Sequence, residues 1–128
     1  RPARYLAGGF LDHHGKPKRE LRDVNATAAA TQIYEKQASP QELGATLEAL
    51  RQALPLYRGR PQERLSKATY EALETVSQMY EVPNNPGIVE FVNECGACVR
   101  TDEDLNAFLD HFQAVVRQYS GIAAIKQR

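Results

Sequence analysis

Apolar residues recur at helical spacing in the last third of the chain. The first stripe consists of Ile88, Phe91, Val92, Cys95 and Val99. The second stripe consists of Leu105, Phe108, Leu109, Phe112, Val115, Val116 and Tyr119. Because residues three and four positions apart share one face of an α-helix, these stripes predict two amphipathic helices. Thr101 and Asp104 form a variant capping box that opens the second helix, and we expect Gly121 to end it.

Good capping residues mark two further helices upstream. Asp23 or Asn25 caps the first, which runs through an alanine-rich stretch to about Gln37. The run Ser39–Glu42 is a capping box with proline at the first helical position, and it opens the second helix. Pro55 ends or kinks that helix, because proline lacks the backbone N–H and collides with the preceding turn.

Prolines also open the third and fourth helices. Pro61 starts the third, which closes near Glu81. The apolar side chains that we expect to point inward from it are Leu65, Leu73, Val76 and Met79. The fourth helix starts at Pro86 with Asn85 as its cap, directly after a turn.

These elements predict an all-α fold: a compact bundle of about five helices in a single domain, 1–128. Residues 1–21 are expected to form an irregular entry segment, because glycines and the run 13–17 interrupt any periodicity, and residues 122–128 a tail. No run alternates apolar and polar residues as a strand does. The expected core comprises Leu43, Leu47, Leu50, Leu65, Leu73, Val76, Phe91, Val92, Leu105, Phe108, Phe112 and Val116.

Charge is balanced over the whole chain but not along it. Residues 1–67 carry 12 Lys and Arg against 7 Asp and Glu, whereas residues 68–128 carry 4 against 9. Opposite halves allow one part to attract a polyanion, or allow copies of the chain to stack head to tail. An accidental asymmetry on an ordinary solvated surface accounts for the same numbers.

Two cysteines and three histidines are the residues to consider for a metal or redox site. Cys95 and Cys98 form a C-x-x-C pair, but a thioredoxin-type redox pair requires a βαβ context. A structural zinc site requires four ligands, and His13, His14 and His111 do not stand at ligand spacing from another pair. We interpret the thiols as small side chains one turn apart on a buried helix, and we predict no metal and no cofactor.

Groups suited to catalysis are sparse. His13 and His14 lie beside Asp12, a pairing able to support base catalysis, but no nucleophile, phosphate-binding loop or H-E-x-x-H motif accompanies them. The carboxylates of residues 102–104 suit the positive end of a helix dipole better than acid–base chemistry. We therefore predict that the protein is not an enzyme and that both histidines are solvated loop residues.

Basic residues cluster around the turn between the second and third predicted helices. The candidate RNA-binding residues there are Arg51, Arg58, Arg60, Arg64, Lys67 and Tyr57. Lys and Arg neutralise phosphates without reading sequence, and a tyrosine ring can stack on a base or ribose. Lys18 and Arg19, with Lys16 and Arg22 beside them, form a second basic group in the entry segment. A solvated, salt-bridged surface is the alternative interpretation.

Three stretches of the last third are distinctive: Phe91–Cys95, Arg100–Asp104 and Phe112–Tyr119. Through them, the segment Ile88–Tyr119 resembles the C-terminal half of the small helical subunit of type III-A CRISPR effector complexes, the Csm complexes. Upstream, Tyr5–Leu21 resembles the entry motif of that family, and Ser39–Arg51 resembles one of its helices. Glu42 and Gly44 depart from that helix, in which glutamine and a basic residue are usual, so the resemblance does not extend to an RNA contact at Gly44.

The resemblance implies a non-catalytic subunit that holds a guide RNA–target RNA duplex through phosphate and sugar contacts. The implied partners are guide RNA, target RNA, the backbone and other subunits of the complex, and neighbouring copies of the chain. The absence of a long apolar run and of a disulfide framework fits a cytoplasmic protein without a membrane partner. A helical adaptor that binds only protein is the alternative function. Both a free subunit and a domain of a fused effector fit this sequence.

Overall fold

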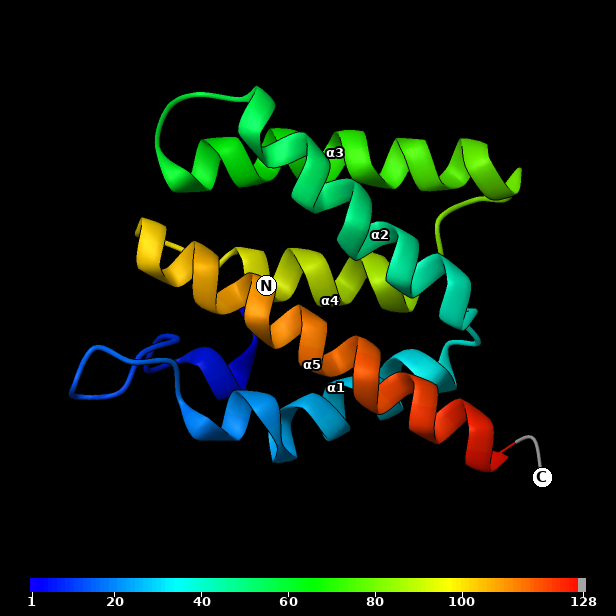
Figure 1. Cartoon of the computed structure of the whole chain (residues 1–128), viewed down its shortest axis with the longest axis horizontal. Helices are drawn as coiled ribbons and strands as arrows, with labels where there is room; N and C mark the ends of the chain where they lie inside the picture. The colour runs from blue at the N-terminus through cyan, green and yellow to red at the C-terminus, as the bar shows by residue number, and fades with distance from the viewer. Residues whose placement is uncertain (127–128) are drawn as a thin grey trace.

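Five α-helices and three short 3₁₀ helices make up the fold in the computed structural model, which describes residues 1–126 (Figure 1). The α-helices are α1 (Val24–Glu35), α2 (Pro40–Ala53), α3 (Pro61–Tyr80), α4 (Pro86–Gly96) and α5 (Asp102–Lys126). The 3₁₀ helices are η1 (Arg4–Leu6), η2 (Arg19–Arg22) and η3 (Leu54–Leu56). Over the described residues there is no β-strand, only an isolated bridge between Leu11 and Pro17. The predicted all-α fold is confirmed.

The helix α5 is the element that joins the two sides of the bundle. Its most extensive packing is against α1, and it also contacts α2, α3 and η2. On the other side, α2 packs extensively against α3. In Figure 1, α1 and α3 therefore lie on opposite sides, with α4 and α5 between them. Within residues 1–126, no helix combines the length and apolarity needed to cross a bilayer.

Side-chain caps open three of the helices where the sequence predicts them. The hydroxyl of Ser39 accepts the N–H of Glu42 at 3.0 Å at the start of α2. The side-chain oxygen of Asn85 accepts a first-turn N–H of α4 at 2.8 Å. Thr101 accepts the N–H of Asp104 at 3.0 Å, and the carboxylate of Asp104 accepts the N–H of Thr101 at 3.3 Å, which completes a reciprocal capping box. These N-terminal boundaries are confirmed.

The predicted cap of α1 is only partly confirmed. Asp23 precedes the helix, but its side chain makes no capping hydrogen bond, and Asn25 already lies in the first turn. The helix ends at Glu35, and Gln37 then adopts a left-handed backbone with φ 64°. α1 therefore owes its position to packing rather than to a side-chain cap, because its buried face contacts α5 and η2.

The expected end of the last helix at Gly121 is wrong. α5 continues through this glycine to Lys126, so residues 122–126 of the predicted tail are helical, and residues 127–128 lie outside the described part of the chain. Glycine weakens a helix by about 1 kcal/mol relative to alanine, but it does not stop one. Beyond it, Ile122 is half-buried and Ala123 is buried, so the apolar stripe continues for another turn and holds the helix in place.

The core contains nearly all of the residues predicted for it, with one correction on α3. Met79 is 60% exposed, because the buried face of α3 follows the smaller residues Ala68, Thr69 and Ala72 before Val76. Leu73 and Val116, predicted as core, are partly buried and pack against its edge. The centre is a cluster of aromatic rings, in which Phe91 and Phe112 meet edge to face at 5.1 Å between centroids. 

The entry segment lacks an α-helix, as predicted, but it is not peripheral. Leu6, Phe10 and Leu21 are each at most 2% exposed and belong to the same core. The ring of Phe10 packs edge to face against Phe108 of α5, with centroids 6.3 Å apart. Apolar burial without helical spacing is therefore the feature that the sequence pattern did not predict.

Candidate nucleic-acid interface

Five cations surround the turn between α2 and α3, and we call them the α3 basic cluster. They are Arg51, Arg58, Arg60, Arg64 and Lys67. Arg51 lies in the last turn of α2, and Arg60 is the N-cap residue of α3. All members except Arg64 are exposed. The fold thus brings together the cations that the sequence placed in one region, and it directs four of them to solvent.

Arg64 has a different environment from the other members. Its Nη1 atom lies 3.5 Å from Oδ1 of Asp102 at the start of α5, and its side chain is 25% exposed. An acid of α5 therefore faces one member of the cluster. Nearby, the amide of Gln62 donates to the carbonyls of Gly96 at 3.0 Å and Val99 at 2.7 Å. These two hydrogen bonds attach the start of α3 to the last residue of α4 and to the connection that follows it.

Tyr57 is only partly exposed, unlike most of the cluster. Its ring is half-buried against the core, and its hydroxyl donates to a carboxylate oxygen of Glu71 at 3.1 Å. This hydrogen bond raises the pKa of Tyr57 above its ordinary value, because ionisation would place two negative charges side by side. The observed contacts give Tyr57 a packing role, and stacking on a base or ribose stays a prediction.

The second basic group, which we call the entry basic group, surrounds η2. It consists of Lys16, Lys18, Arg19 and Arg22. Lys18 is half-buried and Arg19 is exposed, whereas Arg22 forms a loose ion pair with Asp110 of α5 at 3.8 Å. The loop before it is ordered by local hydrogen bonds, since the carboxylate of Asp12 accepts the backbone N–H groups of His14 at 2.8 Å and Lys16 at 3.1 Å.

The loop histidines are solvated, as predicted. His13 and His14 are exposed, and their rings lie tilted to each other with centroids 3.9 Å apart. The two backbone hydrogen bonds to Asp12 lower the pKa of its carboxyl group below the ordinary value. The side chain of Asp12 therefore stabilises a turn of the loop by accepting these two backbone N–H groups.

Both basic groups lie toward the same end of the bundle. In Figure 1 the connection between η3 and α3 and the loop before η2 are both on the left, with the start of α5 between them. That start carries the acids Asp102, Glu103 and Asp104. The opposite balances of the two sequence halves therefore do not form two separate ends, because an acidic helix start lies beside the basic residues.

The two cysteines are free thiols in different surroundings. Cys95 is buried in α4, as predicted, but Cys98 falls in the turn after that helix and is half-buried. Burial raises the pKa of the Cys95 thiol to about 12, so it is protonated at neutral pH. In the part of the chain that the structure describes, no three His, Cys, Asp or Glu side chains are grouped to hold a metal ion.

A buried polar cluster joins three distant parts of the chain. The hydroxyl of Tyr5 lies 2.7 Å from Nε2 of His111 and 3.1 Å from Sγ of Cys95. The other ring nitrogen of His111, Nδ1, lies 2.6 Å from the backbone oxygen of Leu21. His111 is 0% exposed and Cys95 is 1% exposed, whereas Tyr5, which joins them, is only partly buried.

The sequence indicates that His111 is buried, but it does not indicate which residue is its partner. His111 stands three residues after Phe108 and one before Phe112, so the helical stripe places it at the edge of the buried face. A histidine in that position calls for polar partners in the core. Its partner Tyr5 is 106 residues away, and no periodicity connects the two.

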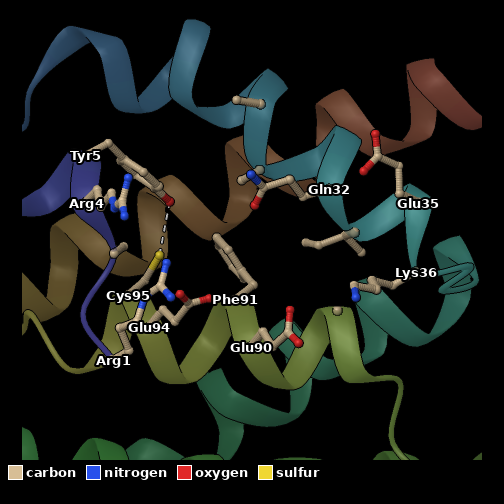
Figure 2. Close-up of a pocket in the computed structure, with 15 residues that line it drawn as sticks. Arg1, Arg4, Tyr5, Gln32, Glu35, Lys36, Glu90, Phe91, Glu94 and Cys95 are labelled. Atoms are coloured by element: carbon tan, nitrogen blue, oxygen red, sulfur yellow. Dashed lines mark hydrogen bonds between the residues drawn. The ribbon is translucent and has the colours of Figure 1, made fainter.

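A cavity of about 430 Å³ lies beside this cluster, between η1, α1 and α4 (Figure 2). Its walls include apolar, aromatic and thiol side chains, namely Ile33, Phe91, Tyr5 and Cys95. Its rim includes charged side chains of both signs, namely Arg4, Lys36, Glu90 and Glu94. Because opposite charges share the rim, the cavity does not favour an anionic over a cationic ligand.

Comparison with known protein families, with curated proteins and with solved structures found no match.

Proposed function

We propose that this protein is a non-catalytic small subunit of a type III CRISPR RNA-guided effector complex that stabilises the guide RNA–target RNA duplex by backbone contacts. One observation carries the proposal. Arg51, Arg58, Arg60 and Lys67 are exposed around one turn, and none of them takes part in the ion pairs found among residues 1–126. Cations that no neighbouring carboxylate neutralises are available to a polyanion.

The chemistry of the cluster suits a duplex of any sequence. Guanidinium and ammonium groups bind phosphate oxygens, and such contacts position a nucleic acid without reading its bases. A subunit that serves changing guides requires this kind of contact. The entry basic group, at the same end of the bundle, supplies a second point of contact in this proposal through Lys18 and Arg19.

Arg64 takes a different role in the proposal from the one predicted. Its ion pair with Asp102 joins α3 to α5, and in this proposal Arg64 positions the start of α3 and does not itself bind phosphate. We therefore assign the main phosphate contacts to Arg51, Arg58, Arg60 and Lys67.

The proposal is tested with two variants of equal charge. The first replaces Arg58, Arg60 and Lys67 with alanine, and the second replaces the exposed cations Lys36, Arg117 and Lys126 with alanine. Binding of a fluorescent 12-base-pair RNA duplex is measured by anisotropy at several salt concentrations. We expect the first variant to bind more weakly and to reduce the log–log salt slope by roughly 2 to 3, since each phosphate contact contributes a little under one unit. The matched control should retain the slope of the unmodified protein.

Equal salt slopes for the two variants would remove the α3 basic cluster from the proposed interface. Crosslinking of the bound duplex followed by mass spectrometry then locates the surface that is used. If the protein binds no RNA either alone or within an assembled complex, the proposed function itself is wrong.

A protein-binding adaptor is the second candidate, and one surface favours it. Tyr70 is 74% exposed, which is high for a large aromatic side chain. A cavity of about 370 Å³ between α3 and α4 includes Tyr70 in its lining and contains no charged side chain. Depletion of charge is typical of the centre of a protein interface. Association of the protein with itself through this surface, without affinity for RNA, would favour this function.

A further inference from the structure

The hydrogen bonds around His111 have a single consistent direction when the ring is neutral. The backbone oxygen of Leu21 can only accept, so Nδ1 of His111 carries the proton and donates to it. Nε2 is then an acceptor, and the hydroxyl of Tyr5 must donate to it. The only remaining role for the Tyr5 oxygen is to accept the S–H of Cys95. The chain therefore runs from the thiol through the phenol to the imidazole and ends on the backbone of η2.

This chain of hydrogen bonds attaches the entry segment to the helices α4 and α5. Tyr5 belongs to η1 and Leu21 to η2, while Cys95 and His111 belong to α4 and α5. A backbone hydrogen bond from Ala3 to the carbonyl of Glu94, at 3.0 Å, attaches the same segment to α4. The 3₁₀ helices η1 and η2 are thus both attached to the bundle. Tyr5 of η1 and Leu21 of η2 contact His111 directly, and Ala3, just before η1, bonds the residue that precedes Cys95.

The elements packed around His111 offer no buried carboxylate to a charged imidazole. Tyr5 faces it from η1, α4 contributes Cys95 with Glu94 beside it, and Cys98 lies in the turn that follows α4. On the η2 side, Arg22 pairs with Asp110 at the surface, and both side chains are more than half exposed. The buried residues of α1 are Ala26, Ala29, Ala30 and Ile33, none of which titrates. 

We propose that Tyr5, Cys95 and His111 form a proton-operated latch, which holds the entry segment 1–21 on α4 and α5 and releases it when His111 becomes an imidazolium. Protonation of Nε2 places a second donor against the Tyr5 hydroxyl. The hydroxyl must then turn and donate to the Cys95 sulfur, which is a weak acceptor, and the S–H loses its partner. A buried positive charge is added with no opposite charge to balance it.

The titration of His111 agrees with this geometry. Burial lowers its pKa below the ordinary value of about 6.5, and the hydrogen bond to Leu21 offsets only part of that effect. Once the segment is released, the ring gains access to water and its pKa returns toward 6.5. The released form therefore binds the proton more tightly, and release becomes more favourable as the pH falls below that value.

Release would change two surfaces. The cavity in Figure 2 loses the wall made by Tyr5, so that Cys95 at its floor becomes accessible. Lys18, directly before η2, and Arg19, the first residue of η2, lose their fixed position relative to the α3 basic cluster. The latch itself does not depend on the proposed function, since it is defined by contacts within the chain.

Hydrogen–deuterium exchange of the full chain between pH 7.5 and 5.0 tests the proposal. After correction for the intrinsic pH dependence of exchange, we expect protection of residues 1–11 to fall by up to about tenfold per pH unit below pH 6.5, as one added proton requires. Protection of α2 and α3 should stay constant over the same range. Equal protection of residues 1–11 at both ends of the range would overturn the latch.

Substitution of each histidine in turn identifies the group that titrates. His111→Gln keeps a neutral acceptor near Tyr5 and should abolish the pH dependence of residues 1–11. The matched controls His13→Gln and His14→Gln change exposed loop residues and should leave that dependence unchanged. A pH dependence that follows either loop histidine instead would assign the effect to the loop and refute the latch.

A second variant covers the possibility that His111→Gln does not fold. Tyr5→Phe retains the ring and removes the hydroxyl that joins Cys95 to His111. Loss of one such hydrogen bond should speed exchange of residues 1–11 about threefold to tenfold at pH 7.5. In a Cys98→Ser background, Cys95 becomes the only thiol, and its modification by 4,4′-dithiodipyridine should accelerate at pH 5.5 relative to the same protein with His111→Gln. Unchanged exchange in Tyr5→Phe together with unchanged thiol modification would also refute the proposal.

Discussion

The entry segment and the α4–α5 pair contribute neighbouring parts of one core but are built differently. α4 and α5 direct Phe91, Phe108 and Phe112 inward at helical spacing, and each helix opens with a side-chain cap. The entry segment has neither an α-helix nor a side-chain cap on η1 or η2, yet Phe10 is as buried as Phe108. Regular hydrogen bonding is therefore not required for an apolar side chain to reach the core. What the entry segment requires instead is contact with helices that lie far away in sequence.

The largest expected effect compares the two regions directly. Phe112→Ala and Phe10→Ala each remove a ring that is 0% exposed, and each should cost about 3–5 kcal/mol in the free energy of unfolding. Urea denaturation at pH 7.5 measures both values. If Phe10→Ala costs less than about 1 kcal/mol, the entry segment is an appendage that detaches before the helices unfold, and its place in the common core is wrong.

The pH dependence of stability should distinguish the two regions next. The pKa of His111 is lowered in the folded protein, so the unfolded chain binds the proton at a higher pH. The stability associated with neutral His111 is complete above about pH 6.5 and is lost as the pH falls from there toward the folded-state pKa. The loss approaches about 1.4 kcal/mol per pH unit. Denaturation curves from pH 7.5 to 5.5 measure it, and a variant without His111 should lose this component.

Helix caps give a smaller and sharper contrast. Thr101→Ala removes an acceptor that bonds the N–H of Asp104, and it should destabilise the protein by about 1 kcal/mol. Asp23→Ala removes a side chain that makes no capping bond at the start of α1, and it should change stability by less than about 0.5 kcal/mol. Thermal unfolding of both variants checks the order. A larger loss for Asp23→Ala would mean that α1 depends on its N-terminal carboxylate after all.

The smallest effect concerns the end of α5. Gly121 is helical, and a Cβ atom at this position meets no other atom within 4 Å. Gly121→Ala should therefore stabilise the protein by about 0.5–1 kcal/mol, since alanine loses less backbone freedom than glycine in a helix. Differential scanning calorimetry measures this gain. A decrease in the unfolding temperature would indicate that the helix does not continue through this residue in solution.

Local chemistry explains why most of the fold was predictable. Ser39, Asn85 and Thr101 bond N–H groups within three residues, so their caps depend on sequence neighbours alone. Proline at the start of α2, α3 and α4 acts through its own ring. Gly121 and Met79 were predicted incorrectly for the opposite reason, because packing beyond the local turn decides whether a helix continues and which of its faces is covered.

The candidate interface was predictable as a region but not residue by residue. Arg58 and Arg60 lie in or beside a proline-bounded turn, and such turns are exposed in most proteins. Arg64 belongs to the same stretch, yet it pairs with Asp102, which is 38 residues away. No local rule distinguishes Arg64 from Lys67, because the difference arises from the helix that happens to pack beside one of them.

The sequence by itself determined that the chain forms α-helices, where four of them begin, and which turn carries exposed positive charge. These properties follow from side chains that act on their own backbone or on residues one helical turn away. Only the tertiary structure decided that Phe10 enters the core, that Arg64 is paired, and that Tyr5, Cys95 and His111 meet. Such contacts join segments from opposite ends of the chain, and their partners are set by how all of the helices pack together.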